Sequence, residues 1–475
     1  MEGSFQKITL TVTERFRGIE ECMMEITLQF TFRKLKGRRS VDRALWGSTP
    51  IVVKRYFPHP KQSRDRQREW ERLKKLYSLG LDVPEPLCWG VDNTGAEVVV
   101  LRYLENGRNL EDYLFADCSQ QERQVIFQQF MEVLATHHRA GLWQGDSHLG
   151  NFIWDGEKLY ALDAASFKFV SGSLNLALRA KNLAQLLVAG KWSWTEEMWE
   201  ALPFYTEKMG RSEWIEPLKK KLGQWIPYLR KKRLKGYLKK TRRSCSDFER
   251  QRSRGKCLLT ERILPAALKQ QFAENPDRLI QDGEVIKAGN TCTVAAFEMG
   301  GQAYILKRYN LKPLFYRICH IFHTSRALKS WSSGHGWRLI GLPTPRPWAC
   351  LEERRWPLRG RSFLLLEKDF GTPLEAFVSE HWNQPDLLSM VTATFAQVWR
   401  AWGQLKAFHG DLKASNILVS EEGSLSFLDL DSFRFFLSSF CFRRKRKKDY
   451  CRFIRNWQEN PEVAALFHER IGRDG

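Results

Sequence analysis

The sequence predicts an α+β fold built as two tandem domains, each with a strand-rich first part and a helical second part. Three observations support this prediction. The chain has 475 residues, which is long for a single domain. A pattern of polar residues in a loop and hairpin occurs twice. Each copy follows strand-like segments and an amphipathic helix. We expect a first domain over 1–218, a basic bridge over 219–256 and a second domain over 257–475.

The composition is that of a folded and strongly cationic protein. Hydrophobic residues make up 43% of the chain, which is enough for packed cores and argues against general disorder. There are 76 Lys and Arg residues against 54 Asp and Glu, a net charge of +22. This excess favours an anionic partner, namely a membrane surface, nucleic acid or a phosphorylated substrate, although a solvated basic face is the plain alternative.

Cysteine usage and hydropathy indicate the compartment. The 10 cysteines are scattered without metal-binding spacing, which predicts reduced thiols rather than a disulfide framework. The first residues lack the pattern of a signal peptide, and no run of about 18 apolar residues occurs. We therefore expect a cytoplasmic protein that meets a membrane only at its surface.

The stretch 144–163 carries the first set of chemically suggestive residues. Asp146 lies in an expected loop, Asn151 follows five positions later, and Asp163 ends a short strand. Two strands are expected on either side of Asp155-Gly156, which would form a two-residue hairpin turn. This layout places Asp146, Asn151 and Asp163 on one side of a hairpin. Phosphoryl transfer needs such a set, because one Asp accepts the proton of the attacking hydroxyl while an Asn and an Asp hold Mg²⁺.

The same layout returns in the second half of the chain. The run His409-Gly-Asp-Leu-Lys-Ala-Ser-Asn416 precedes a second expected hairpin that ends in Asp429. Asp411 and Asn416 are again five positions apart. Asp429 follows Asp411 by 18 positions, one more than the matching step in the first copy. Two copies in the same order predict a duplicated domain.

Both stretches resemble the catalytic loop and metal-binding strand of the protein-kinase-like superfamily. The first is similar to the small-molecule kinase branch, and the second is closer to bacterial lipopolysaccharide core kinases of the Kdo and heptose type. The resemblance covers nearly the whole chain as two tandem bilobal domains, with the nucleotide between the lobes of each. It implies ATP and Mg²⁺ as cofactors. It also implies catalytic bases at Asp146 and Asp411, and metal ligands at Asn151, Asp163, Asn416 and Asp429.

In the first half, the resemblance implies a phosphate-binding ion pair. Residues 51–54 are expected to form a strand that ends in Lys54, and in the kinase fold this lysine holds the α- and β-phosphates. The segment 64–76 has the apolar spacing of a helix. On this helix Glu69 is the candidate partner of Lys54, and Glu71 is the alternative.

Three further segments complete the expected first domain. Residues 35–40 contain one glycine, Gly37, and form either the turn over the phosphates or an ordinary turn. Residues 98–104 are expected to form a buried strand that leads to the hinge, where adenine binds backbone groups in the superfamily. Ser119 and Glu122 form a capping box that opens a helix leading to the catalytic loop.

The expected bridge, 219–256, concentrates positive charge. It contains 16 Lys and Arg residues against two acidic ones, with aromatic residues such as Trp225, Tyr228 and Tyr237 between them. A helix with aromatic residues on one side and cations on the other suits anionic lipid or glycolipid. The alternatives are a helix that packs its aromatic residues on the first domain and solvates its charges, and a surface for single-stranded nucleic acid.

The second half repeats the lysine motif but not its acidic partner. Lys307-Arg-Tyr repeats the run at Lys54, so Lys307 is the second candidate phosphate-binding lysine. The position that matches Glu69 is Ser330, and no acidic residue lies between Lys307 and Glu352. We therefore expect Lys307 to lack a local carboxylate and to swing freely, unless a carboxylate from elsewhere in the chain reaches it.

The second half has four more informative segments. Gly300-Gly301 is expected to form a hairpin turn, and 388–405 shows helical apolar spacing. Lys413 lies two positions after Asp411, where protein kinases use a lysine against the transferred phosphate. The six consecutive cations of 443–448 are expected to be exposed, or to hold a phosphorylated glycan or an anionic leaflet.

The function expected from the sequence is ATP- and Mg²⁺-dependent phosphorylation of a sugar hydroxyl on lipopolysaccharide core, at the cytoplasmic face of the inner membrane. The substrate follows from the family resemblance and the basic charge. The alternatives are a pseudokinase scaffold for envelope biosynthesis and a protein or small-molecule kinase. We expect anionic glycolipid and the anionic inner-membrane surface as partners, with nucleic acid least favoured. Because the first domain has the complete residue set, we expect it to carry most of the activity.

Overall fold

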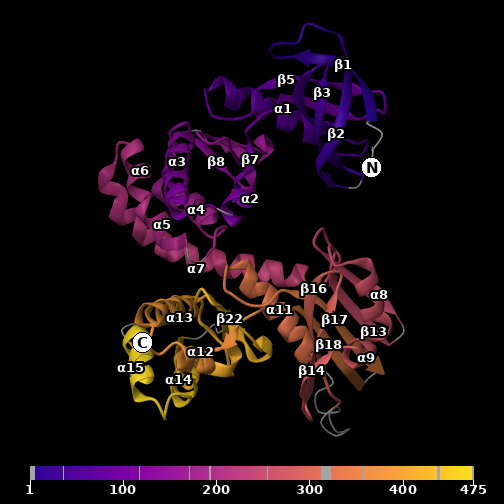
Figure 1. Cartoon of the computed structure of the whole chain (residues 1–475). Helices are drawn as coiled ribbons and strands as arrows, with labels where there is room; N and C mark the ends of the chain where they lie inside the picture. Colours follow the sequence, from indigo (N-terminus) through magenta and orange to yellow (C-terminus); the bar gives the residue numbers. More distant parts are fainter. Residues whose placement is uncertain are drawn as a thin grey trace. The chain divides into compact units, whose positions relative to one another are not determined.

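The computed structural model describes residues 6–35, 37–116, 118–170, 172–191, 194–253, 255–311, 323–355, 358–435 and 439–472. It shows a mixed α/β protein that divides into two compact units (Figure 1). The first unit extends to Ile226 and the second begins at Pro227, with Lys191 grouping with the second. This division falls inside the predicted bridge, 219–256. The expectation of a strand-rich N-terminal region followed by helices is confirmed.

The first unit begins with an antiparallel barrel. Its strands are β1 (Gln6–Arg15), β2 (Met23–Leu35), β3 (Arg39–Trp46), β4 (Thr49–Tyr56), β5 (Pro86–Asp92) and β6 (Glu97–Arg102). They close in the order β1-β2-β3-β4-β6-β5. Alternate side chains such as Ile8, Ile26, Ile51, Val53 and Val98 point inward and form one hydrophobic cluster. Packed side chains therefore fill the interior of the barrel, so a functional site on this sheet would lie on its outer face.

The pairing of β3 with β4 fixes which side chains share that outer face. Val41 lies opposite Lys54, and Arg39 lies opposite Tyr56. Paired residues point to the same side of a sheet, as do residues two apart on one strand. Because Val53 points into the barrel, Lys54, Tyr56, Val41 and Arg39 all lie on the outer face. Lys54 contacts a helix there, as described below.

The rest of the first unit is mainly helical. Its helices are α1 (Gln62–Ser78), α2 (Leu110–Phe115), α3 (Gln120–Arg139), α4 (Leu176–Leu187), α5 (Thr195–Glu200) and α6 (Leu202–Lys208). One small sheet has the order β10-β9-β7, made of β10 (Leu159–Ala161), β9 (Phe152–Trp154) and β7 (Arg108–Asn109). Another pairs β8 (Leu142–Gln144) with β11 (Phe167–Phe169). The predicted capping box is confirmed, because Ser119 and Glu122 exchange both hydrogen bonds at the start of α3.

The prediction of a two-residue hairpin turn at Asp155-Gly156 is wrong. Trp154 pairs with Leu159, so four residues connect β9 to β10. The Asp155 carboxylate accepts hydrogen bonds from the backbone N–H groups of Glu157 at 2.9 Å and Lys158 at 2.7 Å. Asp side chains stabilise longer turns in this way, which explains why the Asp-Gly pair did not impose the shortest turn.

Helix α7 (Ile215–Lys240) begins in the first unit and ends in the second. Its apolar residues Leu218, Leu222, Leu229 and Leu234 are buried, while Tyr228 is exposed. Within the predicted bridge, α7 is followed by a strand, β12 (Phe248–Ser253), that belongs to the sheet of the second unit. The bridge thus combines a basic helix with the first strand of a sheet.

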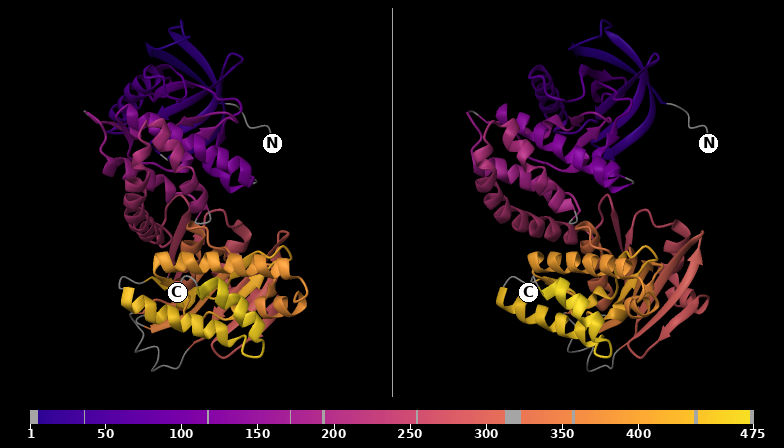
Figure 2. Two further views of the ribbon diagram at one scale, coloured as in Figure 1. Left: turned by 90° about the vertical axis from the view of Figure 1, so that its left-hand side faces the viewer. Right: turned by 60° about the vertical axis from the view of Figure 1, so that its left-hand side comes forward.

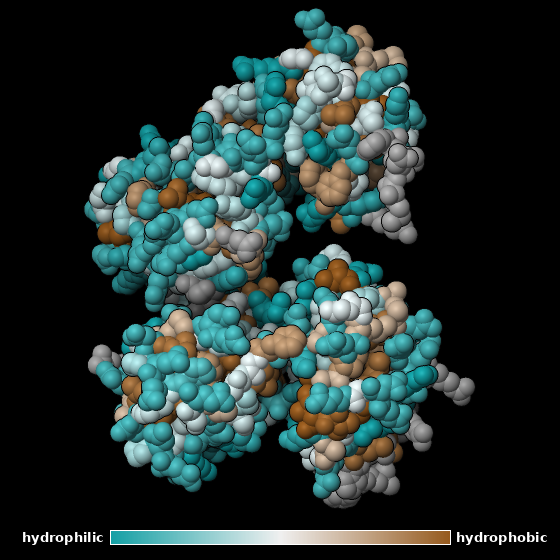
Figure 3. Space-filling model, in the orientation of Figure 1, coloured by the Kyte–Doolittle hydropathy of each residue, from teal (hydrophilic) through white to brown (hydrophobic). Residues whose placement is uncertain are grey.

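The second unit contains an open seven-stranded antiparallel sheet. Besides β12, its strands are β13 (Lys256–Glu261), β14 (Glu284–Ala288), β15 (Cys292–Met299), β16 (Gln302–Tyr309), β17 (Pro347–Arg355) and β18 (Leu358–Glu367). The order is β12-β13-β17-β18-β16-β15-β14. The predicted turn between β15 and β16 is confirmed, since Gly300 and Gly301 have φ angles of +62° and +75°. At the β14 edge, Val285 and Ile286 are exposed. Figure 3 shows hydrophobic surface over the sheet of the second unit.

The rest of the second unit is mainly helical. Its helices are α8 (Ala266–Glu274), α9 (Pro276–Gln281), α11 (Arg326–Leu339), α12 (Leu374–Glu380), α13 (Pro385–Leu405), α14 (Ser439–Arg455) and α15 (Pro461–Gly472). Figure 2 shows α13, α14 and α15 side by side, and their facing residues Phe395, Phe453 and Phe467 share one core. The predicted helix at 388–405 is confirmed by α13.

Two small sheets in the second unit correspond to those of the first. One has the order β19-β21-β22, made of β19 (Thr372–Pro373), β21 (Ile417–Val419) and β22 (Leu425–Phe427). The other pairs β20 (Ala407–Phe408) with β23 (Arg434–Phe435). In both units a hairpin pairs with a short strand that precedes a short helix. The large sheets differ, because the first closes into a barrel and the second stays open.

Candidate functional site

In the first unit, a lysine from β4 and a glutamate from α1 form a buried ion pair. The Lys54 ammonium contacts one carboxylate oxygen of Glu69. The other oxygen of Glu69 accepts a hydrogen bond from the Ala165 N–H at 2.8 Å. Glu71, the alternative partner, lies 3.2 Å from Lys74. The structure therefore pairs Lys54 with Glu69, as the sequence analysis favoured.

The same ion pair determines the charge state of its surroundings. Burial raises the pKa of Glu69, but Lys54 and the Ala165 amide outweigh burial, so the pKa is lowered and the carboxylate is ionised. For Asp163 the balance is opposite. Burial and then the negative charge of Glu69 raise the pKa of Asp163, and Lys54 only partly offsets them. Asp163 is thus a half-buried carboxylate whose negative charge lacks full compensation.

The loop of Asp146 and the hairpin of Asp163 are joined through one asparagine. The Asn151 side-chain N–H donates to the Asp146 carbonyl oxygen at 2.7 Å, and the Asn151 carbonyl accepts from the Leu162 N–H at 2.8 Å. Asp163 has a left-handed backbone, with φ of +53°. The Asp146 side chain is exposed. The structure therefore brings Asp146, Asn151 and Asp163 together on one side of the hairpin.

A buried polar network supports the base of this loop. Asn182 on α4 donates to the Gln144 carbonyl at 2.8 Å and to the Ser147 hydroxyl at 2.9 Å. His138 lies between the Asn182 side chain and the Tyr205 hydroxyl. Burial lowers the pKa of His138 to about 3, so the ring is neutral. The sequence analysis missed His138, although its place among the buried residues of α3, an amphipathic helix, was a usable signal.

In the second unit, the counterpart lysine has a different partner. The Lys307 ammonium lies 2.5 Å from a carboxylate oxygen of Asp429. Ser330, at the place of the missing glutamate, is buried and lies 3.1 Å from the Tyr309 hydroxyl. The prediction that Lys307 swings freely is wrong, because a carboxylate distant in sequence holds it. Lys307 chiefly lowers the pKa of Asp429.

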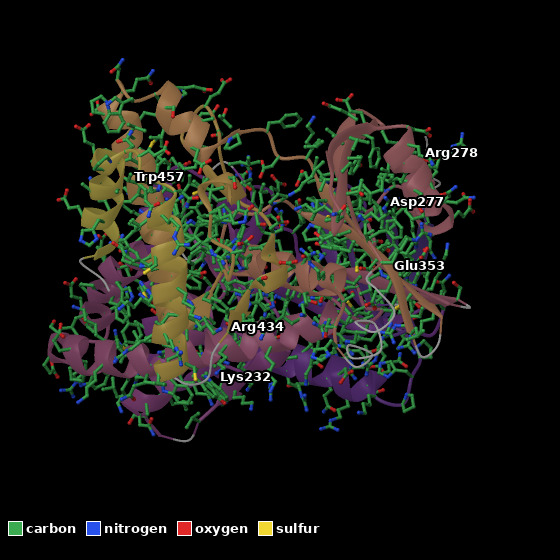
Figure 4. The ribbon with its side chains drawn as sticks, turned by 90° about the horizontal axis from the view of Figure 1, so that it is seen from below. Lys232, Asp277, Arg278, Glu353, Arg434 and Trp457 are labelled. Atoms are coloured by element: carbon green, nitrogen blue, oxygen red, sulfur yellow. The ribbon has the colours of Figure 1, made fainter. Side chains whose placement is uncertain are left out.

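The candidate base of the second unit is also paired. The Arg452 guanidinium contacts the Asp411 carboxylate, and the Lys413 ammonium lies 3.5 Å from the same oxygen. As in the first unit, the asparagine of the loop, Asn416, donates to the Asp411 carbonyl at 2.8 Å. Figure 4 shows Trp457 near the end of α14, the helix that carries Arg452, and labels Arg434 on β23. Sequence reasoning missed Arg452, which lies just beyond the cationic run 443–448.

Some of the candidate site residues of the second unit line a cavity of about 450 Å³. Lys307, Ser330, Asn416 and Asp429 form its polar side, and Leu366 and Leu428 contribute to its apolar side. Ligand pockets commonly combine a mainly apolar lining with a few polar groups in this size range. The cavity can therefore hold a small molecule with a flat apolar part and an anionic part.

A buried aspartate supports the loop of the second unit. The Asp449 carboxylate accepts hydrogen bonds from the backbone N–H groups of His409 at 2.7 Å and Gly410 at 3.0 Å. Burial raises its pKa, and these hydrogen bonds only partly oppose the rise, so the pKa is about 6. Asn182 supports the corresponding loop of the first unit without a charge.

Asp449 should make the second unit less stable as the pH rises from about 4 to about 6. The folded unit holds the Asp449 proton over this interval while the unfolded chain has lost it, so stability falls as the folded group ionises. The effect is at most about 3 kcal/mol. Asp449→Asn removes this contribution. The unfolding temperature of the natural protein, relative to the variant, should decrease across the interval. A difference that stays constant from pH 4 to pH 7 would contradict the assignment.

Metal-binding clusters and membrane-spanning helices are both absent from the described residues. Within the ranges that the structure describes, no group of three or more His, Cys, Asp or Glu side chains is arranged to hold a metal ion. In the same ranges, no helix combines the length and apolar character needed to cross a bilayer.

Comparison with known proteins gives one family match. Residues 25–205 match the family model described as the Lipopolysaccharide kinase (Kdo/WaaP) family. No curated protein matches the chain. The matched range begins in β2, ends in α6 and includes the Lys54–Glu69 pair and the Asp146 loop. The predicted resemblance to lipopolysaccharide kinases is confirmed, because residues 25–205 carry the sequence pattern of the Kdo/WaaP family. The match lies in the first half of the chain, for which the sequence analysis favoured the small-molecule kinase branch, and not in the second half, where it placed the closer resemblance.

Proposed function

We propose that the first unit transfers a phosphoryl group from ATP to a sugar hydroxyl of lipopolysaccharide core, with Mg²⁺, at the cytoplasmic face of the inner membrane. The observation that carries this proposal is the Lys54–Glu69 ion pair beside Asp163, in the part of the chain that matches a kinase family. Kinases position phosphates with a lysine that a glutamate holds in place. A fixed ammonium next to an uncompensated carboxylate suits a metal-bound nucleotide.

The residues around Asp163 fit a divalent cation. Burial and the nearby Glu69 carboxylate disfavour the negative charge of Asp163, and a bound cation would relieve that cost. Asn151 uses its side-chain N–H for the Asp146 carbonyl, which leaves its side-chain oxygen for another partner. Carboxylate and amide oxygens are suitable ligands, and Mg²⁺ usually combines one or two carboxylates with substrate phosphates.

The proposed roles follow from these positions. ATP supplies the phosphoryl group and Mg²⁺ neutralises phosphate charge when they are bound. Lys54, held by Glu69, would contact the α- and β-phosphates, while Asp163 and Asn151 would hold the metal. Asp146 is exposed and would accept the proton of the sugar hydroxyl. The Asn151 hydrogen bond would keep the Asp146 loop in position for this step.

The second unit has the same types of residue at corresponding positions, but its carboxylates form different ion pairs. By analogy, Lys307 and Lys413 would contact phosphates, Asn416 and Asp429 would hold metal, and Asp411 would be the base. However, Lys307 pairs with Asp429, and Arg452 pairs with Asp411. Each carboxylate would have to release a cation before it could act. This observation favours a second candidate function for this unit, that of a pseudokinase scaffold with little turnover.

The repeated sheets and loops support the proposal of a tandem duplication of a bilobal, kinase-like domain. In both units an asparagine side chain donates to the carbonyl of the aspartate five residues earlier. In both units the aspartate after the hairpin has a left-handed backbone, with φ of +53° at Asp163 and +54° at Asp429. Non-glycine residues seldom adopt this conformation, so its recurrence at matching positions supports a common origin.

The basic helix α7 is the proposed contact with the anionic inner-membrane surface or glycolipid. Lys231, Lys232, Lys235 and Lys239 are exposed on its second half, and Tyr228 is exposed before them. The leucines Leu218, Leu222, Leu229 and Leu234 of α7 are buried, so the helix would bind mainly by charge and not by insertion of its apolar face. Nucleic acid stays the least favoured partner.

Binding to anionic vesicles should therefore be weakened by salt and by charge reversal. Each Lys or Arg near an anionic surface contributes about 1 kcal/mol, and physiological salt screens charges over about 8 Å. Reversing the charges of the exposed lysines in 230–243 should reduce binding by several orders of magnitude. Vesicle flotation measures the fraction of protein that is bound, with neutral vesicles as the control. Binding that is indifferent to both salt and charge reversal would contradict the proposed surface contact.

The acceptor decides between the remaining enzyme classes. Transfer of label from γ-labelled ATP to isolated lipopolysaccharide core supports the proposed function. Transfer to a protein or to a soluble small molecule, with none to the glycolipid, would instead identify a protein or small-molecule kinase. The absence of any nucleotide turnover would identify a scaffold.

A further inference from the structure

Arg39 lies next to Lys54 on the outer face of the barrel. It begins β3, just after the turn at Gly37, and it pairs with Tyr56, while Val41 pairs with Lys54. Arg39 and Lys54 are thus diagonal neighbours on one face. Such diagonal neighbours lie roughly 7–8 Å apart at their backbones, which is within reach for long side chains. The register therefore places a second cation at the candidate site.

The electrostatics of the site agree with this placement. For Glu69, burial raises the pKa and Lys54 lowers it, and Arg39 is a further positive charge that lowers it. For Asp163, burial and Glu69 raise the pKa, while Lys54 and Arg39 lower it. Arg39 acts on both carboxylates, so its charge faces the space around Lys54, Glu69 and Asp163.

Arg39 makes no direct contact with an anionic group in the described part of the chain, although Glu69 and Asp163 lie close enough to feel its charge. Its side chain is half-buried and forms no ion pair or hydrogen bond with any described residue. Lys54, in contrast, is already paired with Glu69. An arginine presents a planar fork of donors that matches phosphate oxygens, and the fork of Arg39 makes no direct hydrogen bond within the described residues. The unpaired guanidinium is therefore suited to an anionic group of a ligand.

The second unit lacks this arginine. There Tyr309 pairs with Cys292, in the register that pairs Tyr56 with Arg39 in the first unit. Lys307 pairs with Val294, as Lys54 pairs with Val41. The two sites thus match at the lysine and differ at the neighbouring position. An arginine at this strand position therefore occurs only in the unit with the Lys–Glu pair, whereas Lys287 and Lys368 lie with Lys307 around the cavity of the second unit.

We infer that Arg39 binds the phosphate groups of the nucleotide in the first unit, as a second cation beside Lys54. This inference rests on the proposed function. The turn between β2 and β3 has one glycine, Gly37, so it offers less of the close backbone approach by which glycine-rich turns hold phosphates. The guanidinium of Arg39 supplies bidentate donors in its place.

Nucleotide affinity tests the inference directly. All proteins would be the full chain with Lys307→Ala, so that binding reports the first unit. Arg39→Gln should weaken the binding of ATP and ADP roughly 10- to 100-fold, because a hydrogen-bonded charge is lost. Adenosine, which has no phosphate, should bind with unchanged affinity. Arg39→Lys should bind ATP and ADP with affinities between those of the parent protein and of Arg39→Gln. Calorimetric titration, with competition for the weakest ligand, gives the dissociation constants.

Lys34→Gln is the matched control. Lys34 is exposed on β2 and pairs with Ser40, so it lies in the same hairpin but on the opposite face from Arg39. The Lys34→Gln substitution removes the same positive charge as Arg39→Gln, and it should leave the affinities for ATP, ADP and adenosine unchanged. Unchanged ATP binding in Arg39→Gln, or an equal loss for adenosine, would overturn the inference. If Lys54→Ala loses ATP while Arg39→Gln keeps it, only this inference fails. If the parent protein binds no nucleotide, the proposed function fails as well.

Discussion

Asp146→Asn is expected to remove nearly all phosphoryl transfer, with a loss of about 10²- to 10⁴-fold. Asparagine has almost the same shape as aspartate but cannot accept the proton of an attacking hydroxyl. The fold should be preserved, because Asn151 contacts the backbone carbonyl of residue 146 and not its carboxylate. Turnover of ATP with the glycolipid acceptor measures the loss.

The matched variant in the second unit is Asp411→Asn, for which we expect a smaller loss. Arg452 and Lys413 both lie against the Asp411 carboxylate, so in the observed state an ion pair occupies the oxygen that would receive the proton. The two variants remove the same group from corresponding loops, which controls for general effects of the substitution. If Asp411→Asn is the inactive protein and Asp146→Asn is nearly normal, the two units have the reverse of the proposed roles.

Asp163→Asn is expected to reduce Mg²⁺-dependent turnover by at least about 10²- to 10³-fold without unfolding the protein. The substitution removes the carboxylate proposed to hold the metal. Asparagine tolerates the left-handed backbone of residue 163, whose φ is +53°. The substitution also removes the negative charge of the half-buried Asp163 carboxylate, which lies near Glu69. The unfolding temperature should therefore stay the same or rise while activity falls.

This opposite movement of stability and activity distinguishes a metal ligand from a structural residue. A structural aspartate would lose stability and activity together. The measurement is best made with Asp429→Asn in all proteins, so that the second unit does not contribute. Unchanged turnover after Asp163→Asn in that background would refute the metal-binding role. A lowered unfolding temperature would show that the carboxylate supports the fold.

Local patterns in the sequence were sufficient to predict several elements. The helical spacing around Trp70 located α1 and favoured Glu69, one residue before it, over Glu71 as the partner of Lys54. The capping box at Ser119 located the start of α3. These features depend on residues within one or two turns of each other. Their energetics are therefore visible in a short window of sequence.

Contacts between distant residues could not be predicted in the same way. Lys307 and Asp429 are 122 positions apart, and Arg452 reaches Asp411 from the last long basic helix. Neither contact has a periodic signature, because each depends on how helices and sheets pack. The missing glutamate at Ser330 was visible in the sequence, but the carboxylate that replaced it was not. The same holds for Arg39, whose position depends on strand register.

Phosphorylation of lipopolysaccharide core by the first unit is the activity that we propose for this protein. The most direct test incubates the purified full chain with γ-labelled ATP, Mg²⁺ and isolated lipopolysaccharide core, and compares it with Asp146→Asn and Asp411→Asn. We predict label in the glycolipid with the natural protein, very little with Asp146→Asn, and a substantial amount with Asp411→Asn. No label in the glycolipid from the natural protein, or equal labelling by the natural protein and Asp146→Asn, would contradict the claim.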